Sequence, residues 1–119
     1  MTFRERLEGI CSRVEGSLGA VIIAEDGIVV ERHAADPSLD IELASVELAG
    51  AARDVRQATA AIGAGELEEL IVTNAGRLAV LRLVGPGYYL LLHLAPDALV
   101  GRARYELRRA AHELAGEFI

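Results

Sequence analysis

The side chains that could act as bases, nucleophiles or metal ligands are few in this sequence and lie far apart. None of the three histidines is spaced with Cys, Asp or Glu in the pattern of a metal site. His112 lacks the second histidine that a zinc-binding helix needs. His93 lies in an apolar segment, where a core or interface histidine is more common than a catalytic base. The four serines lie outside any nucleophile-elbow motif, and Cys11 falls on or beside the apolar side of a predicted helix.

The glycine-containing segments do not match a nucleotide site either. Gly63-Ala64-Gly65 follows a predicted helix, whereas phosphate binds at the N-terminus of a helix. Gly85-Pro86-Gly87 has the length of a turn between two strands. Because there is no phosphate-binding loop, the chain is not expected to hydrolyse nucleotides itself. We therefore predict a protein without enzymatic activity, cofactor or metal, which acts through its surfaces.

The composition excludes several other classes of protein. With 119 residues, 52% of them hydrophobic, the chain is expected to form one folded domain, residues 1–119. The net charge of −6 argues against nucleic acid as a partner. The most apolar stretch, residues 78–96, is interrupted by Arg82 and His93, so no membrane insertion is expected. A single cysteine and an N-terminus unlike a signal peptide indicate a cytoplasmic protein, and the absence of Lys is typical of a GC-rich prokaryotic genome.

The apolar periodicity predicts three helices and five strands. Asp26-Gly27 lies between two aliphatic segments and supplies the positive φ of a tight hairpin turn. Asp36 or Ser38 is the expected cap of the long middle helix. The predicted elements are a helix over 3–14, strands over 18–25 and 28–33, a helix over 36–62, strands over 67–73, 78–84 and 88–94, and a helix from 96. The order α-β-β-α-β-β-β-α predicts an α+β fold, with a five-stranded antiparallel sheet flanked by helices.

The middle helix has two apolar stripes on nearly opposite sides. The first is a normal core stripe, formed by Ile41, Leu48, Ala52, Val55, Thr59 and Ile62 with Ala44 and Ala51 beside it. The second is formed by Leu39, Leu43, Val46, Gly50 and Ala61. Either the first helix or the chain termini cover this second stripe, or it meets another subunit, with Gly50 allowing close approach. We favour the second interpretation because the chain has a larger share of apolar residues than a typical soluble domain, which already indicates a partner.

The strand predicted at 67–73 begins with the acidic segment Glu66-Leu67-Glu68-Glu69. Acidic residues at the start of an edge strand commonly prevent mispairing. They could equally flank an edge that pairs with its own symmetry mate. The sequence leaves both interpretations open.

The order and spacing of these elements resemble the Roadblock / dynein light chain family over essentially the whole chain. The resemblance rests on the hairpin GAVIIAEDGIVVER, the Ala-rich helix LASVELAGAARD and the ending LAPDALVGRARYELRRAAHEL. Its most specific parts are Asp26-Gly27 after an aliphatic strand and Gly101 early in the last helix, followed by Arg and Leu. Within the family, the chain resembles the prokaryotic mutual gliding-motility protein B type.

The resemblance implies a profilin-like sheet and a homodimer formed through the long helix and the strand after it. It also implies a non-enzymatic regulator or scaffold that binds a small Ras-like GTPase and stimulates GTP hydrolysis without an arginine finger. The residues implied in the dimer or partner interface are Leu39, Leu43, Val46, Glu47, Gly50, Arg53, Asp54, Leu67, Glu69, Ile71 and Thr73. A structural light-chain-like adaptor is an alternative function. A small-molecule sensor is a weaker one, because convergent polar and aromatic residues are scarce.

Overall fold

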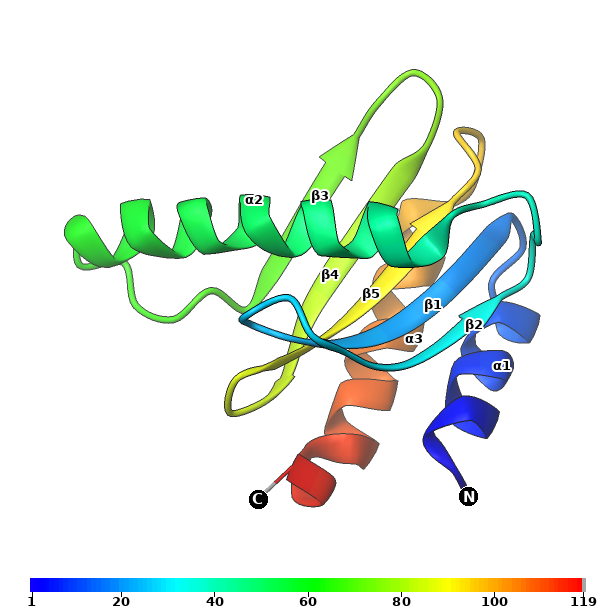
Figure 1. Ribbon diagram of the computed structural model, residues 1–119, viewed down its shortest axis with the longest axis horizontal. Helices are drawn as coiled ribbons and strands as arrows, with labels where there is room; N and C mark the ends of the chain where they lie inside the picture. Colours follow the sequence, from blue (N-terminus) through cyan, green and yellow to red (C-terminus); the bar gives the residue numbers. More distant parts are fainter. Residues whose placement is uncertain (119) are drawn as a thin grey trace.

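The computed structural model describes residues 1–118, and its order of elements confirms the predicted fold class (Figure 1). The helices and strands are α1 (Phe3–Arg13), β1 (Ser17–Ala24), β2 (Val29–Ala34), α2 (Ile41–Ala61), β3 (Glu69–Thr73), β4 (Leu78–Gly85), β5 (Tyr88–Leu94), α3 (Val100–Leu114) and the 3-10 turn η1 (Ala115–Phe118).

The five strands form one antiparallel sheet in the order β2-β1-β5-β4-β3, so β2 and β3 are its edges. The predicted turn at Asp26-Gly27 is confirmed. Gly27 has a φ of 92°, and the Asp26 carboxylate accepts a hydrogen bond from the backbone N–H of Ile28 at 3.2 Å. This conformation is one that glycine adopts without steric cost, which explains why the sequence reverses direction there.

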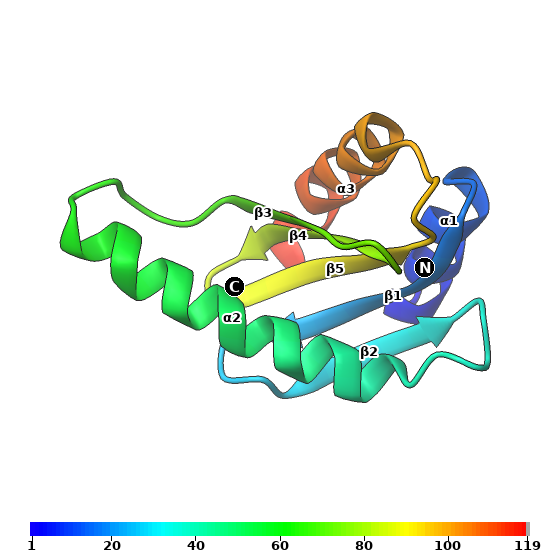
Figure 2. The ribbon, with the colours of Figure 1, turned by 90° about the horizontal axis from the view of Figure 1, so that it is seen from above.

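The sheet is covered on both faces (Figure 2). α1 and α3 pack on one face around a core that includes Ile22, Leu92 and Leu107. α2 lies alone on the other face, over a second core that includes Val21 and Leu91. Alternate residues of the central strands therefore point into two different cores, as the continuous apolar runs of β1 and β5 require.

The long helix begins later than the sequence predicted. α2 starts at Ile41, and its N-cap is Asp40, whose carboxylate accepts a hydrogen bond from the backbone N–H of Leu43 at 3.2 Å. Asp36 and Ser38 are not its cap. The Asp36 carboxylate instead accepts hydrogen bonds from the Ser38 N–H at 2.9 Å and the Ser38 hydroxyl at 2.7 Å. This local turn uses the groups that were expected to cap the helix.

The last helix also begins later than predicted, at Val100 rather than at Pro96. Residues 95–98 form a turn closed by a 3.1 Å hydrogen bond from Ala98 N to Ala95 O. Leu99 precedes the helix and is 75% exposed. Ile62, predicted on the core stripe of the middle helix, follows the end of α2 and is 79% exposed.

Gly19 of β1 allows α2 to approach the sheet closely. A Cβ atom at this position would clash with the Ile41 side chain and lie 3.0 Å from the carbonyl oxygen of His33. We expect Gly19→Val to lower the free energy of unfolding by about 1–3 kcal/mol, because overpacking forces neighbouring atoms to move. Urea denaturation measures this change. Gly101→Ala is the matched control, since a Cβ there meets no atom within 4 Å, and an equal loss in the control would contradict the packing argument.

Candidate functional site: the exposed side of α2 and the β3 edge

One flank of α2 is attached to the β1–β2 hairpin. Glu42 forms an ion pair of 3.0 Å with Arg32 of β2. Near the other end of the helix, Arg56 forms an ion pair of 3.4 Å with Glu25, at the start of the hairpin turn. Arg56 also donates a 3.1 Å hydrogen bond to the hydroxyl of Tyr89. These contacts lie along the flank of α2 that faces the β1–β2 hairpin.

The buried side of α2 differs in part from the predicted core stripe. Its fully buried positions are Ile41, Ser45, Ala49 and Ala52. Ile41 and Ala52 were predicted there, whereas Leu48, Val55 and Thr59 are only half-buried. The helix is rotated so that small side chains face the sheet. Ile41 is the one large side chain among the four buried positions.

The second apolar stripe of α2 points away from the sheet. Leu43 is 58% exposed and Val46 is 40% exposed. A Cβ at Gly50 would meet no atom within 4 Å. Of the other residues implied in the interface, Glu47, Arg53 and Asp54 are exposed, and Leu39 is half-buried against the core below α2.

The first helix and the chain termini do not cover this stripe. α1 lies on the opposite face of the sheet (Figure 2). Near the C-terminus, Phe118 stacks on Phe3 of α1 with ring centroids 5.4 Å apart. The alternative in which these segments bury the stripe is therefore wrong. Within residues 1–118 the stripe has no covering element.

A groove of about 380 Å³ separates the other flank of α2 from the β3–β4 hairpin. Its sides carry both apolar and charged groups. It is lined by Leu39, Asp40, Leu43, Ala44, Glu47, Leu48, Asn74, Arg77, Leu78, Ala79 and His93. Leu43 of the second stripe and the neighbouring Glu47 are among these residues, so the exposed side of α2 borders the groove.

A buried polar pair lies below this groove. The Ser45 hydroxyl and His93 Nε2 are 2.9 Å apart and share a hydrogen bond, and both residues are buried. Burial lowers the pKa of His93 to about 4, and the positive charge of Arg77 adds to this effect. His93 is therefore neutral at neutral pH and links α2 to β5. The sequence interpretation missed Ser45, although it follows Ile41 at i+4 on the buried side of the helix.

The edge strand β3 has one paired side and one open side. Leu70 and Val72 lie half-buried against the core below α2, and so does Leu67, just before the strand. Ile71 is 37% exposed. Thr73 is also exposed.

Glu69 lies on the α3 face of β3 and has partners within its own chain. It forms ion pairs of 3.3 Å with Arg82 and 2.9 Å with Arg104. These contacts do not decide whether the acidic start of the strand prevents mispairing or flanks an edge that pairs with its symmetry mate.

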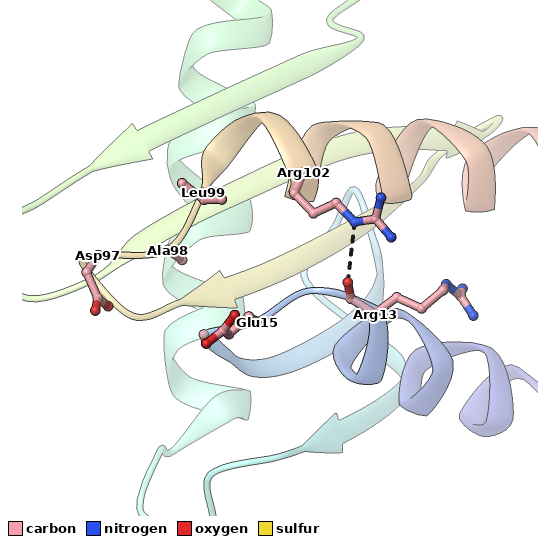
Figure 3. Close-up of a pocket in the computed structure, with 7 residues that line it drawn as sticks. Arg13, Glu15, Asp97, Ala98, Leu99 and Arg102 are labelled. Carbon is pink, nitrogen blue, oxygen red and sulfur yellow. Dashed lines mark hydrogen bonds between the residues drawn. The ribbon is translucent and has the colours of Figure 1, made fainter.

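Another cavity lies between the end of α1 and the start of α3 (Figure 3). It has a volume of about 600 Å³, and its charged residues are two arginines and two carboxylates. Arg13 donates a 2.8 Å hydrogen bond to the buried Glu106, and Arg102 lies 3.1 Å from the same carboxylate. Arg102 also donates a 3.4 Å hydrogen bond to the Arg13 carbonyl (Figure 3). These guanidinium groups therefore stabilise the α1–α3 contact.

Other reactive groups in the described part of the chain lie apart from one another. Burial raises the pKa of Cys11 to about 11, so its thiol stays protonated at neutral pH. Among residues 1–118, no group of three or more His, Cys, Asp or Glu is placed to hold a metal ion. No helix in the described part of the chain is long and apolar enough to cross a membrane. The exposed side of α2 and the β3 edge remain as the candidate site.

Comparison with solved structures gives matches over nearly the whole chain. The chain is 36% identical to MglC from Myxococcus xanthus, covering 99% of this chain and 100% of that one, with a TM-score of 0.72. It is 21% identical to a Roadblock/LC7 domain from Streptomyces avermitilis, covering 96% and 95%, with a TM-score of 0.85. It is 20% identical to the gliding protein MglB from Thermus thermophilus, covering 94% and 84%, with a TM-score of 0.82.

A scan against models of protein families found no match, and neither did a search of curated proteins. The match to a profilin among the solved structures confirms that the fold is profilin-like.

Proposed function

Since this chain belongs to the Roadblock/LC7 family, we propose that it is a cytoplasmic, non-enzymatic homodimer that binds and regulates a small Ras-like GTPase. In this function it stimulates GTP hydrolysis by arranging the catalytic groups of the GTPase itself. It donates no arginine finger. The interface residues are those of the outward stripe of α2, its flanking charges and the β3 edge, with Leu43 and Val46 at the centre.

The observation that carries this proposal is the exposed apolar stripe of α2. Two large aliphatic side chains, Leu43 and Val46, lie on the surface of a helix whose opposite side is already buried. Contiguous apolar surface of this kind marks protein interaction sites. The acidic residues Glu47 and Asp54 and the basic Arg53 border the stripe and supply the polar rim that such interfaces have.

A second observation supports self-association. β3 is an edge strand with one unpaired side, and the half-buried Leu67, Leu70 and Val72 lie next to it on the α2 face of the sheet. An edge that adjoins apolar surface is a template for pairing with another chain. A second copy is the partner that offers the same edge.

Static light scattering on the purified protein tests the homodimer. We expect a molar mass twice that of one chain over a range of concentrations. A mass equal to one chain at every concentration would contradict the homodimer.

A pull-down then separates the regulator from the alternative, a structural adaptor. The untagged protein is mixed with Ras-like GTPases of the same genome, each loaded with GTP or GDP. The proposed function requires that the GTPase binds this protein more strongly in one nucleotide state than in the other. Stable association with a larger protein, without binding of any GTPase, would favour the adaptor.

A further inference from the structure

The outer side of α3 is positively charged, although the chain as a whole is negative. The exposed charged residues of this helix are Arg102, Arg104, Arg108 and Arg109, with Glu113 near its end. The net charge of the chain is −6. Positive charge is therefore concentrated along α3, which lies on the other face of the sheet from α2 (Figure 2).

A buried carboxylate is shared by three guanidinium groups on this side of the molecule. The side chain of Glu106 is fully buried. Its oxygens lie 2.8 Å from Arg13 Nε, 3.1 Å from Arg102 Nη2 and 3.9 Å from Arg109 Nη1. Each guanidinium group has five N–H donors, more than one shared carboxylate can satisfy. The arginines therefore keep donors that the carboxylate of an incoming ligand can accept.

Two large apolar side chains are exposed beside these arginines. Tyr105 is 55% exposed, and the guanidinium carbon of Arg102 lies over its ring, 5.7 Å from the centroid. Leu99 is 75% exposed and lines the cavity between α1 and α3 together with Arg102 (Figure 3). Tyrosine and arginine are residue types that often dominate the binding energy of protein interfaces. This side of α3 therefore offers apolar contact as well as positive charge.

The spacing of these residues makes them one continuous surface. Arg102, Arg108 and Arg109 are three or four positions from Tyr105, and residues at these intervals are neighbours on a helix. Leu99 extends the surface at the start of α3. We call these five exposed residues the α3 patch.

From these observations we infer that the α3 patch is a docking surface for an acidic segment of a partner protein. In this interaction the arginines of the patch bind carboxylates, and Tyr105 and Leu99 contact an apolar side chain of the same segment. The α3 patch and the outward stripe of α2 lie on opposite faces of the sheet (Figure 2). The inference is therefore independent of the proposed homodimer and of the GTPase, and both surfaces can be occupied together.

A narrow acidic segment fits the α3 patch better than an anionic membrane does. α1 lies beside α3 on the same face of the sheet (Figure 2), so a flat membrane would approach both helices. Glu5 and Glu8 of α1, and Glu15 just after it, are exposed and would repel anionic headgroups. A segment of a protein can follow α3 alone and avoid these carboxylates.

A second copy of this chain is a less suitable occupant. Contact between the α3 patch and the acidic residues of α2 in another copy would be head-to-tail, and such contacts give open assemblies unless a rotation closes them. Each copy also has a net charge of −6, so that the copies repel one another. The charges therefore favour a different protein as the partner.

Fluorescence anisotropy with a labelled amphipathic peptide of glutamate and leucine tests this inference on the intact protein. We expect saturable binding that weakens as the salt concentration rises, because salt screens charges at an exposed surface. The test variant is Tyr105→Ser, Arg108→Glu. Both side chains are exposed, and Arg108 has no ion pair within residues 1–118. The dissociation constant should rise by at least about 10-fold in this variant.

The matched control is Ile28→Ser, Arg77→Glu, which makes the same change of charge and also removes an exposed apolar side chain. Both positions are exposed in turns away from α3, so the control should bind the peptide like the wild type. Urea denaturation verifies that both variants are folded. An equal loss of affinity in the control, or equal binding of a peptide of glutamine and leucine, would overturn the inference.

Two further measurements distinguish the other occupants. Binding to vesicles of phosphatidylserine and phosphatidylcholine that the Tyr105→Ser, Arg108→Glu variant loses would assign the patch to a membrane. Light scattering that shows assemblies of more than two copies, abolished by the same variant, would assign it to a second copy. Either result, or no binding of the acidic peptide at low salt, would overturn the inference. A monomeric wild type or a failure to bind GTPases would overturn the proposed function and leave this inference standing.

Discussion

Replacing both Leu43 and Val46 by Glu is expected to lower the affinity for the GTPase partner by at least about 100-fold. Each of these side chains contributes about 1.5–3 kcal/mol when an interface buries it completely, and a carboxylate in its place must be desolvated without a partner. Titration calorimetry with the GTPase measures the loss. The free energy of unfolding should change by no more than about 0.5 kcal/mol, because both positions are exposed on the surface of α2.

The control for this variant is Leu99→Glu, which introduces one of the two negative charges at a leucine that is 75% exposed at the start of α3. It should bind the GTPase like the wild type. Retained binding in the Leu43→Glu, Val46→Glu variant would show that the outward stripe of α2 is not the partner site. An equal loss in the control would show that added negative charge, and not the stripe, weakens binding.

Acidification from pH 7 to pH 4 is expected to remove about 3 kcal/mol of stability through His93 alone. The pKa of this histidine falls from its ordinary 6.5 to about 4 in the folded protein, mainly because of burial. The unfolded chain therefore binds a proton below about pH 6.5 that the folded chain does not bind until about pH 4. A difference of one between the pKa values in the unfolded and the folded chain changes the free energy of unfolding by about 1.4 kcal/mol. Stability is full above pH 6.5 and is lost as the pH falls towards 4.

Urea denaturation at several pH values measures this dependence. His93→Gln is the matched variant, because an amide keeps a polar partner for the Ser45 hydroxyl but does not titrate. The variant should lose less stability than the wild type between pH 6.5 and pH 4. If both lose the same amount, the loss originates in other groups, such as the carboxylates of Glu31 and Asp36, whose pKa values are lowered by hydrogen bonds.

The architecture could be read from the sequence because its signals are local. Asp26-Gly27 marks a turn that needs a positive φ, and aliphatic segments on both sides of it mark strands. The same reasoning placed the β4–β5 hairpin, and β5 runs from Tyr88 to Leu94 as predicted. Errors occurred at helix starts. There, several residues compete to cap the helix, and a local turn at Asp36 used the groups assigned to that role.

The details of the candidate site could not be obtained in this way. Helical periodicity showed two apolar stripes, but the side of α2 that faces the sheet is set by packing against strands that are distant in sequence, where Ala49 and Ala52 are buried. The buried Ser45–His93 pair joins residues that are 48 positions apart. Glu106 is buried against Arg13 of another helix. Each of these contacts depends on tertiary packing that residue spacing alone does not encode.

The most direct test of the proposed function is a titration of the wild-type dimer with a Ras-like GTPase of the same genome, loaded in turn with a GTP analogue and with GDP. We expect saturable binding with a clear preference for one nucleotide state, and loss of that binding in the Leu43→Glu, Val46→Glu variant. Absence of binding to either nucleotide state, by a protein that light scattering shows to be dimeric, would contradict the proposed regulation of a GTPase.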